Sequence, residues 1–168
     1  MASKSDPPQP SSQPTQRISL GDLERLRAES RATKGLPSLA ALQLMLGASL
    51  DDDDVIDLGL SEKKSETGTG VTASSRALGI EMAATRARVI ETIFLHSEGH
   101  EKFHVWAGDL GKGLTFSSNP ARVRAAHGAP SRSGTGWDRF DGVDGTVHFQ
   151  YGDTVLRLVT LMAKGTAP

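Results

Sequence analysis

The sequence predicts an α+β domain in which two similar units, each a short helix followed by an antiparallel hairpin, form one sheet with helices on one face. An N-terminal helix precedes them. Three observations support this fold class. Helix-like spacing of apolar residues comes before β-branched stretches twice along the chain. Turns containing Gly and Asp separate those stretches. A length of 168 residues suits one domain.

Composition divides the chain into a tail, a lead-in and a folded domain. Four of its eight prolines lie in the first fourteen residues, among Ser and Gln, where little apolar surface is available for burial. We expect that removing this tail leaves the fold intact. The predicted segments are a disordered tail at 1–16, a helical lead-in at 17–48 and one domain at 49–168, in two halves at 49–112 and 113–168.

The predicted helices follow from apolar residues spaced by three and four positions beside capping residues. They lie at about 18–27, at 38–46, from Asp51–Asp54 onward, and from Pro120 to about His127 with Ser117 or Ser118 as the cap.

The predicted strands are stretches rich in β-branched and aromatic residues between turn residues. They lie at 79–82, 89–95, 103–106, 137–140, 147–151 and 155–162, whereas the polar segment 61–77 and the Ser/Gly-rich segment that follows Pro130 are expected to be loops. The side chains expected in the core are Phe94, Leu95, Phe149, Val159 and Leu161.

The two halves show a weak internal repeat. A shift of 66 residues places Gly79 on Gly145, Val89 on Val155, Ile93 on Val159 and Leu95 on Leu161. One such unit is too small to bury a sheet face alone, so we expect two units side by side to form one continuous sheet.

The second half resembles a known structural pattern. It comprises Gly113–Phe116, the helical run Ala121–Pro130, Trp137–Phe140 and Val147–Tyr151. This order is similar to that of β-lactamase-inhibitor-protein-like domains and of small outer-membrane assembly lipoproteins. The resemblance implies the fold more than the function. The lipoproteins carry a signal and a lipidated cysteine, which this sequence lacks. The implied relatives are therefore inhibitors, including immunity proteins encoded beside bacterial toxins.

Composition narrows the expected location and partners. The formal net charge of −1 gives no overall field toward nucleic acid or anionic lipid. The chain has no cysteine, no secretory apolar run near its start and no apolar stretch of about 20 residues. We therefore expect a cytoplasmic protein that binds neither membrane nor nucleic acid. The one basic-aromatic grouping consists of Arg122, Arg124, Arg132 and Arg139 with Trp137 and Phe140.

No catalytic or cofactor signature emerges from the sequence. His96, His100 and His104 recur every fourth residue, but Gly99 argues against the helix that would align them for zinc. The sequence contains neither an H-E-x-x-H motif nor a G-x-S-x-G motif. We expect no catalytic residues, no metal site and no cofactor. A histidine-dependent metal-binding enzyme and an adaptor of a secretion or assembly machine are the alternative hypotheses.

An acidic cluster is the feature most suggestive of a partner. Residues 47–66 contain seven acidic residues and two lysines, a local charge of −5, whereas a helix cap needs only one or two carboxylates. Such a cluster can steer a basic protein partner toward binding. The expected function is that of an immunity protein, which inhibits a cognate toxin domain by direct binding. The predicted partner-binding residues are Asp52, Asp53, Asp54, Asp57, Trp106, Trp137 and Asp138.

Overall fold

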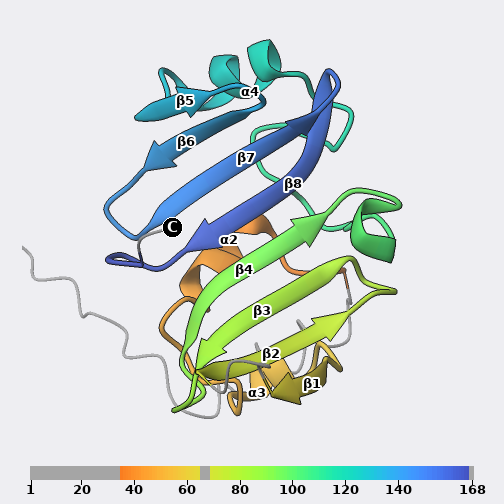
Figure 1. Cartoon of the computed structure of the whole chain (residues 1–168), viewed down its shortest axis with the longest axis vertical. Helices are drawn as coiled ribbons and strands as arrows, with labels where there is room; N and C mark the ends of the chain where they lie inside the picture. Colours follow the sequence, from red (N-terminus) through yellow and green to blue (C-terminus); the bar gives the residue numbers. More distant parts are fainter. Residues whose placement is uncertain (1–34, 65–68, 167–168) are drawn as a thin grey trace, which may run out of the picture. The chain divides into compact units, whose positions relative to one another are not determined.

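The computed structural model describes residues 35–64 and 69–166, which form one eight-stranded antiparallel sheet with a few short helices (Figure 1). The strands lie in the order β1-β2-β3-β4-β8-β7-β6-β5. Their bounds are β1 Ser61–Lys64, β2 Gly70–Ser75, β3 Ile80–Thr85, β4 Ile90–His96, β5 Arg132–Gly134, β6 Trp137–Asp141, β7 Thr146–Gly152 and β8 Val155–Met162. The helices are α2 Leu39–Leu44, α3 Asp53–Ile56, the 3-10 turn η1 His100–Lys102 and α4 Pro120–His127.

The sheet consists of two four-stranded meanders. β1–β4 form the first meander and β5–β8 the second, and antiparallel pairing of β4 with β8 joins them at the centre of the sheet. The central register places Ile93 opposite Leu161 and Leu95 opposite Val159. The fold class expected from the sequence, two helix-plus-hairpin units with helices on one face, is therefore wrong. Helices of six, four and eight residues accompany a sheet that dominates the fold.

The strands that the sequence analysis missed lie at the two ends of the sheet. β1 and β2 occupy the expected loop 61–77, and β5 lies in the expected Ser/Gly-rich loop. The described side chains of β1 and all those of β5 are exposed, so neither shows the alternation of apolar and polar residues that marks a half-buried strand. Short polar strands at sheet edges also discourage pairing with other chains. The segment 103–106, expected to be a strand, is irregular.

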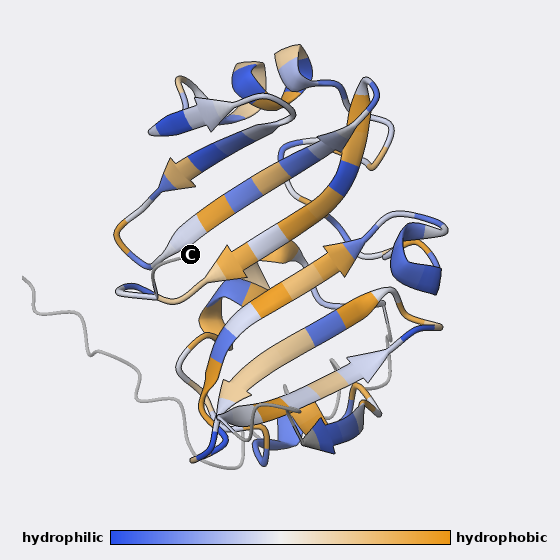
Figure 2. Cartoon of the chain, viewed as in Figure 1, coloured by the Kyte–Doolittle hydropathy of each residue, from blue (hydrophilic) through white to orange (hydrophobic). Residues whose placement is uncertain are grey.

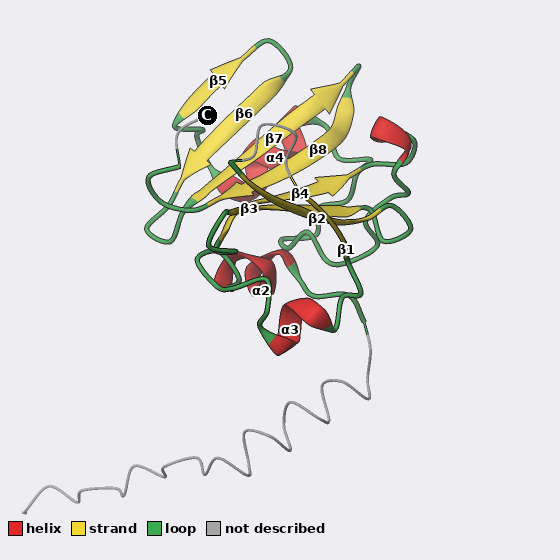
Figure 3. Cartoon of the chain, turned by 60° about the horizontal axis from the view of Figure 1, so that its bottom comes forward, coloured by secondary structure: helices red, strands yellow, loops and turns green. Residues whose placement is uncertain are grey.

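The core lies against one face of the sheet. Alternate residues of the central strands are fully buried there, and Figure 2 shows the matching alternation of apolar and polar residues along the strands. Leu42 of α2, Val55 of α3 and Val123 of α4 belong to the same cluster of buried side chains. Figure 3 shows these three helices beside the sheet. Each fully buried side chain of this size contributes about 1.5–3 kcal/mol relative to exposure.

Most of the predicted core residues are confirmed. Leu95, Phe149, Val159 and Leu161 have no exposed surface. Phe94 is only half-buried, and its expected place in the core is wrong. It precedes Leu95 on β4, and successive residues of a strand point to opposite faces.

Capping explains where the helices begin. The Ser38 hydroxyl accepts a hydrogen bond from the Ala41 amide at 3.2 Å at the start of α2. Asn119, rather than Ser117 or Ser118, caps α4, and its Oδ1 accepts from the Arg122 amide at 2.9 Å. No helix within the described ranges is long and apolar enough to cross a membrane. The predicted tail at 1–16 and helix at 18–27 lie outside the described residues.

Candidate functional site

The face of the sheet opposite the core carries the candidate site. Because Leu95, Val159 and Phe149 point into the core, their neighbours along β4, β8 and β7 point the other way. The strand register aligns these neighbours in rows across the sheet. One row runs Phe94, Thr160, His148, Arg139 and Arg132, and the next runs His96, Leu158, Gln150, Trp137 and Gly134.

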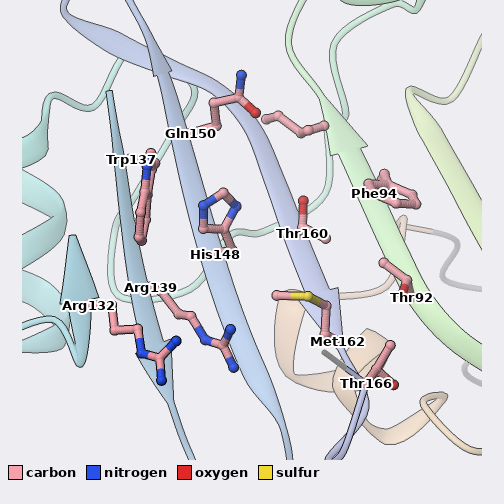
Figure 4. Close-up of a pocket in the computed structure, with 11 residues that line it drawn as sticks. Thr92, Phe94, Arg132, Trp137, Arg139, His148, Gln150, Thr160, Met162 and Thr166 are labelled. Atoms are coloured by element: carbon pink, nitrogen blue, oxygen red, sulfur yellow. The ribbon is translucent and has the colours of Figure 1, made fainter. Parts of the chain in front are cut away.

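A hollow of about 550 Å³ lies on this face, over β4, β8, β7 and β6, and we call it the open-face hollow (Figure 4). Its size falls in the range of binding pockets. Two arginines and one histidine are among its lining residues, and no carboxylate of residues 35–64 or 69–166 is. The lining residues are Thr92, Phe94, Arg132, Trp137, Arg139, His148, Gln150, Leu158, Thr160, Met162 and Thr166.

The indole of Trp137 is held in a fixed place within the hollow. Its ring centroid lies 5.3 Å from that of His148 on the neighbouring strand β7. On its other neighbour, β5, it packs over Gly134, where an added Cβ would lie only 2.6 Å from the indole Cε2. A glycine at this position therefore makes room for the ring. Trp137 is half-buried, so part of its surface remains available.

Arg139 is also positioned by a neighbour. Its Nε donates a hydrogen bond to Asp141 Oδ1 at 2.7 Å, and only 18% of its side chain is exposed. The Thr146 hydroxyl donates to the same carboxylate oxygen at 2.8 Å. Hydrogen bonds from Arg139 and Thr146 lower the pKa of Asp141 below its ordinary value. Arg132 lies directly opposite Arg139 on β5 and is exposed.

His148 lies between Trp137 and Thr160 in the floor of the hollow. Burial, followed by the nearby Arg139 charge, lowers the pKa of its imidazole below the ordinary 6.5. This shift favours the neutral imidazole, which offers the hollow a hydrogen-bonding ring.

The acidic cluster lies elsewhere. Asp52, Asp53, Asp54 and Asp57 are exposed on and beside α3, whose Val55 packs into the core. Asp52 is the N-cap, and its Oδ2 accepts from the Ser49 amide at 3.2 Å, while Asp53 and Asp54 form the first turn. At least part of the cluster therefore supports the start of the helix. Its role in partner binding stays a prediction.

Two of the predicted partner-binding residues are buried. Trp106 is 2% exposed within the core and Asp138 is 0% exposed, so neither provides an accessible contact, and those two assignments are corrected here. Asp138 accepts hydrogen bonds from Arg124 Nε and NH2 at 2.9 and 2.8 Å, and from the Tyr151 hydroxyl at 3.0 Å. The strand alternation explains the difference from Trp137, because adjacent residues of β6 face opposite sides.

The three regularly spaced histidines do not line one surface. His96 Nδ1 and His100 Nδ1 lie 2.9 Å apart, and His96 stacks on Phe103 with ring centroids 3.9 Å apart. Burial, followed by His100, lowers the pKa of His96 to about 4. His104 instead lies 3.3 Å from Glu98. Across residues 35–64 and 69–166, no three His, Asp or Glu side chains gather in a metal-binding arrangement.

Sequence reasoning grouped Arg132, Arg139 and Trp137 but missed the rest of the hollow. Phe94 was assigned to the core, and His148, Gln150 and Met162 received no role. Alternation within each strand could have paired Trp137 with Arg139, and His148 with Gln150. The pairing of β8 with both β4 and β7, which brings Phe94 to the same face, requires the topology.

Comparisons with protein families, curated proteins and solved structures found no match for this chain. What the protein does must be inferred from the open face of its sheet.

Proposed function

We propose that this protein is a non-catalytic protein-binding module whose partner occupies the open-face hollow, and that it works as an immunity protein that blocks a cognate toxin. One observation carries the proposal. The hollow presents a half-buried tryptophan and a fixed arginine on a sheet face opposite the core.

The kinds of residue in the hollow support protein binding. Trp and Arg are enriched among the few residues that dominate interface energetics, and Phe and Met are also enriched at interfaces. The hollow contains Trp137, Arg139 and Phe94, which are partly exposed, and Met162, which is 7% exposed.

Preorganisation supports the same conclusion. The indole of Trp137 fits between Gly134 and His148, and Asp141 holds the Arg139 guanidinium. Side chains that are already ordered lose little conformational entropy on binding, so more of their contact energy contributes to affinity.

The acidic cluster has a different part in this proposal. Because α3 packs on the core side of the sheet, its aspartates and the hollow do not form one patch. The cluster would act at a distance by raising the association rate of a partner with a basic region, whereas the hollow would determine how long the complex lasts.

Affinity capture from the native host with matched variants tests the proposal. A bound protein should be retained by the wild type and by Leu44→Ala, which truncates an exposed apolar side chain of α2. It should be lost with Trp137→Ala, since truncating a central aromatic anchor typically weakens binding about 30-fold or more. Capture that is unaffected by Trp137→Ala would refute the proposed binding surface. Inhibition is then measured by adding the purified chain to an assay of the partner's toxic activity.

A further inference from the structure

The charge of the open-face hollow differs from that of the whole chain. The chain carries a formal net charge of −1, yet the described residues that line the hollow include two guanidinium groups and no carboxylate. Lining residues of one sign concentrate the field in a concave site and attract ligands of the opposite sign.

The two arginines are direct cross-strand neighbours. Arg132 on β5 is opposite Arg139 on β6, and residues opposite each other in an antiparallel pair have Cβ atoms about 4.5–5.5 Å apart. Like charges in this arrangement destabilise the pair of strands. Figure 4 shows both guanidinium groups on the same side of the hollow.

A single neighbouring carboxylate only partly balances them. Asp141 lies outside the lining and contacts Arg139 Nε at 2.7 Å, while Arg132 acts on the same carboxylate through its charge. Within the part of the chain that the structure describes, these two positive groups therefore share one negative group. A carboxylate arriving from a ligand would restore the balance, because guanidinium groups bind carboxylates with paired, charge-assisted hydrogen bonds.

The remainder of the hollow is apolar and aromatic. Trp137, Phe94, Leu158 and Met162 surround the basic pair along the same face. A ligand that fills the hollow must bring apolar surface next to its negative charge. An acidic side chain beside an apolar one on a polypeptide meets both requirements. Single-stranded nucleic acid also combines negative charge with ring faces that stack on aromatic side chains. It fits less well, because it needs a basic groove along its backbone, whereas the chain has a formal net charge of −1 and the hollow offers two guanidinium groups.

We propose that the open-face hollow accepts an acidic segment of the protein partner, with a Glu or Asp carboxylate against Arg132 and Arg139 and an adjacent apolar side chain against Trp137. This inference rests on the proposed protein-binding function and specifies the partner's chemistry. The hollow would then bind an acidic region of the partner, and the acidic cluster on α3 would attract a basic region.

Selection of peptides from a random phage-displayed library on the full chain tests this chemistry. The selected peptides should be rich in Glu or Asp next to aliphatic or aromatic residues. A synthetic copy of the best peptide is then measured by fluorescence anisotropy, beside a copy in which each acidic residue is replaced by its amide. We expect the amide copy to bind about tenfold or more weakly at low salt.

Variants of the chain show where the carboxylate of the bound peptide lies. Arg132→Gln combined with Arg139→Gln should weaken the acidic peptide about tenfold and barely affect the amide copy, which is the coupling expected of groups in contact. Lys112→Gln combined with Arg122→Gln removes the same charge outside the hollow and should change binding less than about twofold. Arg132→Gln alone removes an exposed side chain and provides a test if the double variant unfolds.

The outcomes separate this inference from the function on which it rests. If the peptides depend on Trp137 but are neutral or basic, or if the Arg variants leave their affinity unchanged, the acidic segment is refuted while protein binding stands. If no selected peptide is lost with Trp137→Ala, both are refuted. If an oligothymidylate displaces the peptide and binds more tightly than it, the hollow is a nucleic-acid site and the proposal fails.

Discussion

The two meanders of the sheet have the same strand arrangement but different open faces. One row of residues crosses all eight strands, and in the first meander it contains Ser61, Ser74 and Glu81 before Phe94. At the mirrored places in the second meander it contains Arg132, Arg139 and His148. The shared topology supports both halves, but along this row the second meander presents two arginines and a histidine where the first presents two serines and a glutamate. We therefore expect binding to depend mainly on outward side chains of the second meander, next to Thr92 and Phe94 of β4.

The largest expected effect concerns the two faces of the neighbouring strands β4, β8 and β7. Phe149 and Leu161 are fully buried on the core face, so Phe149→Ala and Leu161→Ala should each lower the free energy of unfolding by about 2–5 kcal/mol. Phe94→Ala, on the open face, should cost less than either, because Phe94 is only half-buried. Urea denaturation measures all three. Equal losses from Phe94→Ala and Phe149→Ala would contradict the assignment of faces.

The ion pair between buried Asp138 of β6 and exposed Arg124 of α4 should contribute to stability at acid pH. Hydrogen bonds from Arg124 hold the pKa of Asp138 below its ordinary 3.8. A depressed carboxyl pKa stabilises the folded state fully above pH 3.8, and that stability is lost as the pH falls through the lower, folded-state value. Asp138→Asn should remove this segment of the pH dependence and cost about 1–3 kcal/mol at pH 7. Denaturation of the wild type and of Asp138→Asn between pH 2 and 7 provides the measurement. If the free energies of unfolding of the two proteins change with pH in parallel, the ion pair does not stabilise the fold.

Gly134→Ala should affect binding with little effect on stability. The backbone at Gly134 does not have a positive φ, so alanine fits the strand, but its Cβ would collide with the Trp137 indole. We expect the indole to move, its acrylamide quenching to rise, and peptide or partner affinity to fall about tenfold. Trp106→Phe in the background isolates the Trp137 signal. Unchanged quenching and affinity would mean that Gly134 does not position the ring.

The smallest expected effect belongs to the acidic cluster. Replacing Asp52, Asp53, Asp54 and Asp57 with asparagine should leave the melting temperature nearly unchanged, because these side chains are exposed. Association with the partner should slow by about threefold at low salt and by less at physiological salt, while dissociation stays the same. Stopped-flow measurements at two salt concentrations separate the rates. An association rate insensitive to the substitutions would limit the cluster to supporting α3.

Local patterns predicted the central strands well, because their buried residues alternate with polar ones and turns separate them. β3, β4, β6, β7 and β8 all lie near their predicted places. The edge strands β1 and β5 were missed because their described side chains are exposed. The neighbouring strand β2 was missed because it is polar and Ala73 is its one buried residue. The N-cap of α4 is Asn119, one residue after the expected Ser118. Ser118 is buried, and its hydroxyl accepts a hydrogen bond from the Thr115 amide at 3.0 Å instead.

The candidate site was harder to predict than the core. Trp137 was selected as an anchor and lines the hollow, but Trp106 was selected on the same grounds and is buried. Nothing in the local sequence separates an indole on the open face from one in an irregular segment under the sheet. Phe94 shows the same difficulty, because an apolar residue between Ile93 and Leu95 is assigned a face only once the strand pairing is known.

The footprint of the captured partner on the sheet tests the central claim most directly. Amide hydrogen exchange of the full chain, alone and in the complex, measures this footprint. We expect added protection in β6, β7 and β8 around the open-face hollow, with β1, β2 and β3 unchanged. Added protection confined to the first meander or to α3, with β6 and β7 unaffected, would contradict the assignment of binding to the open face of the second meander.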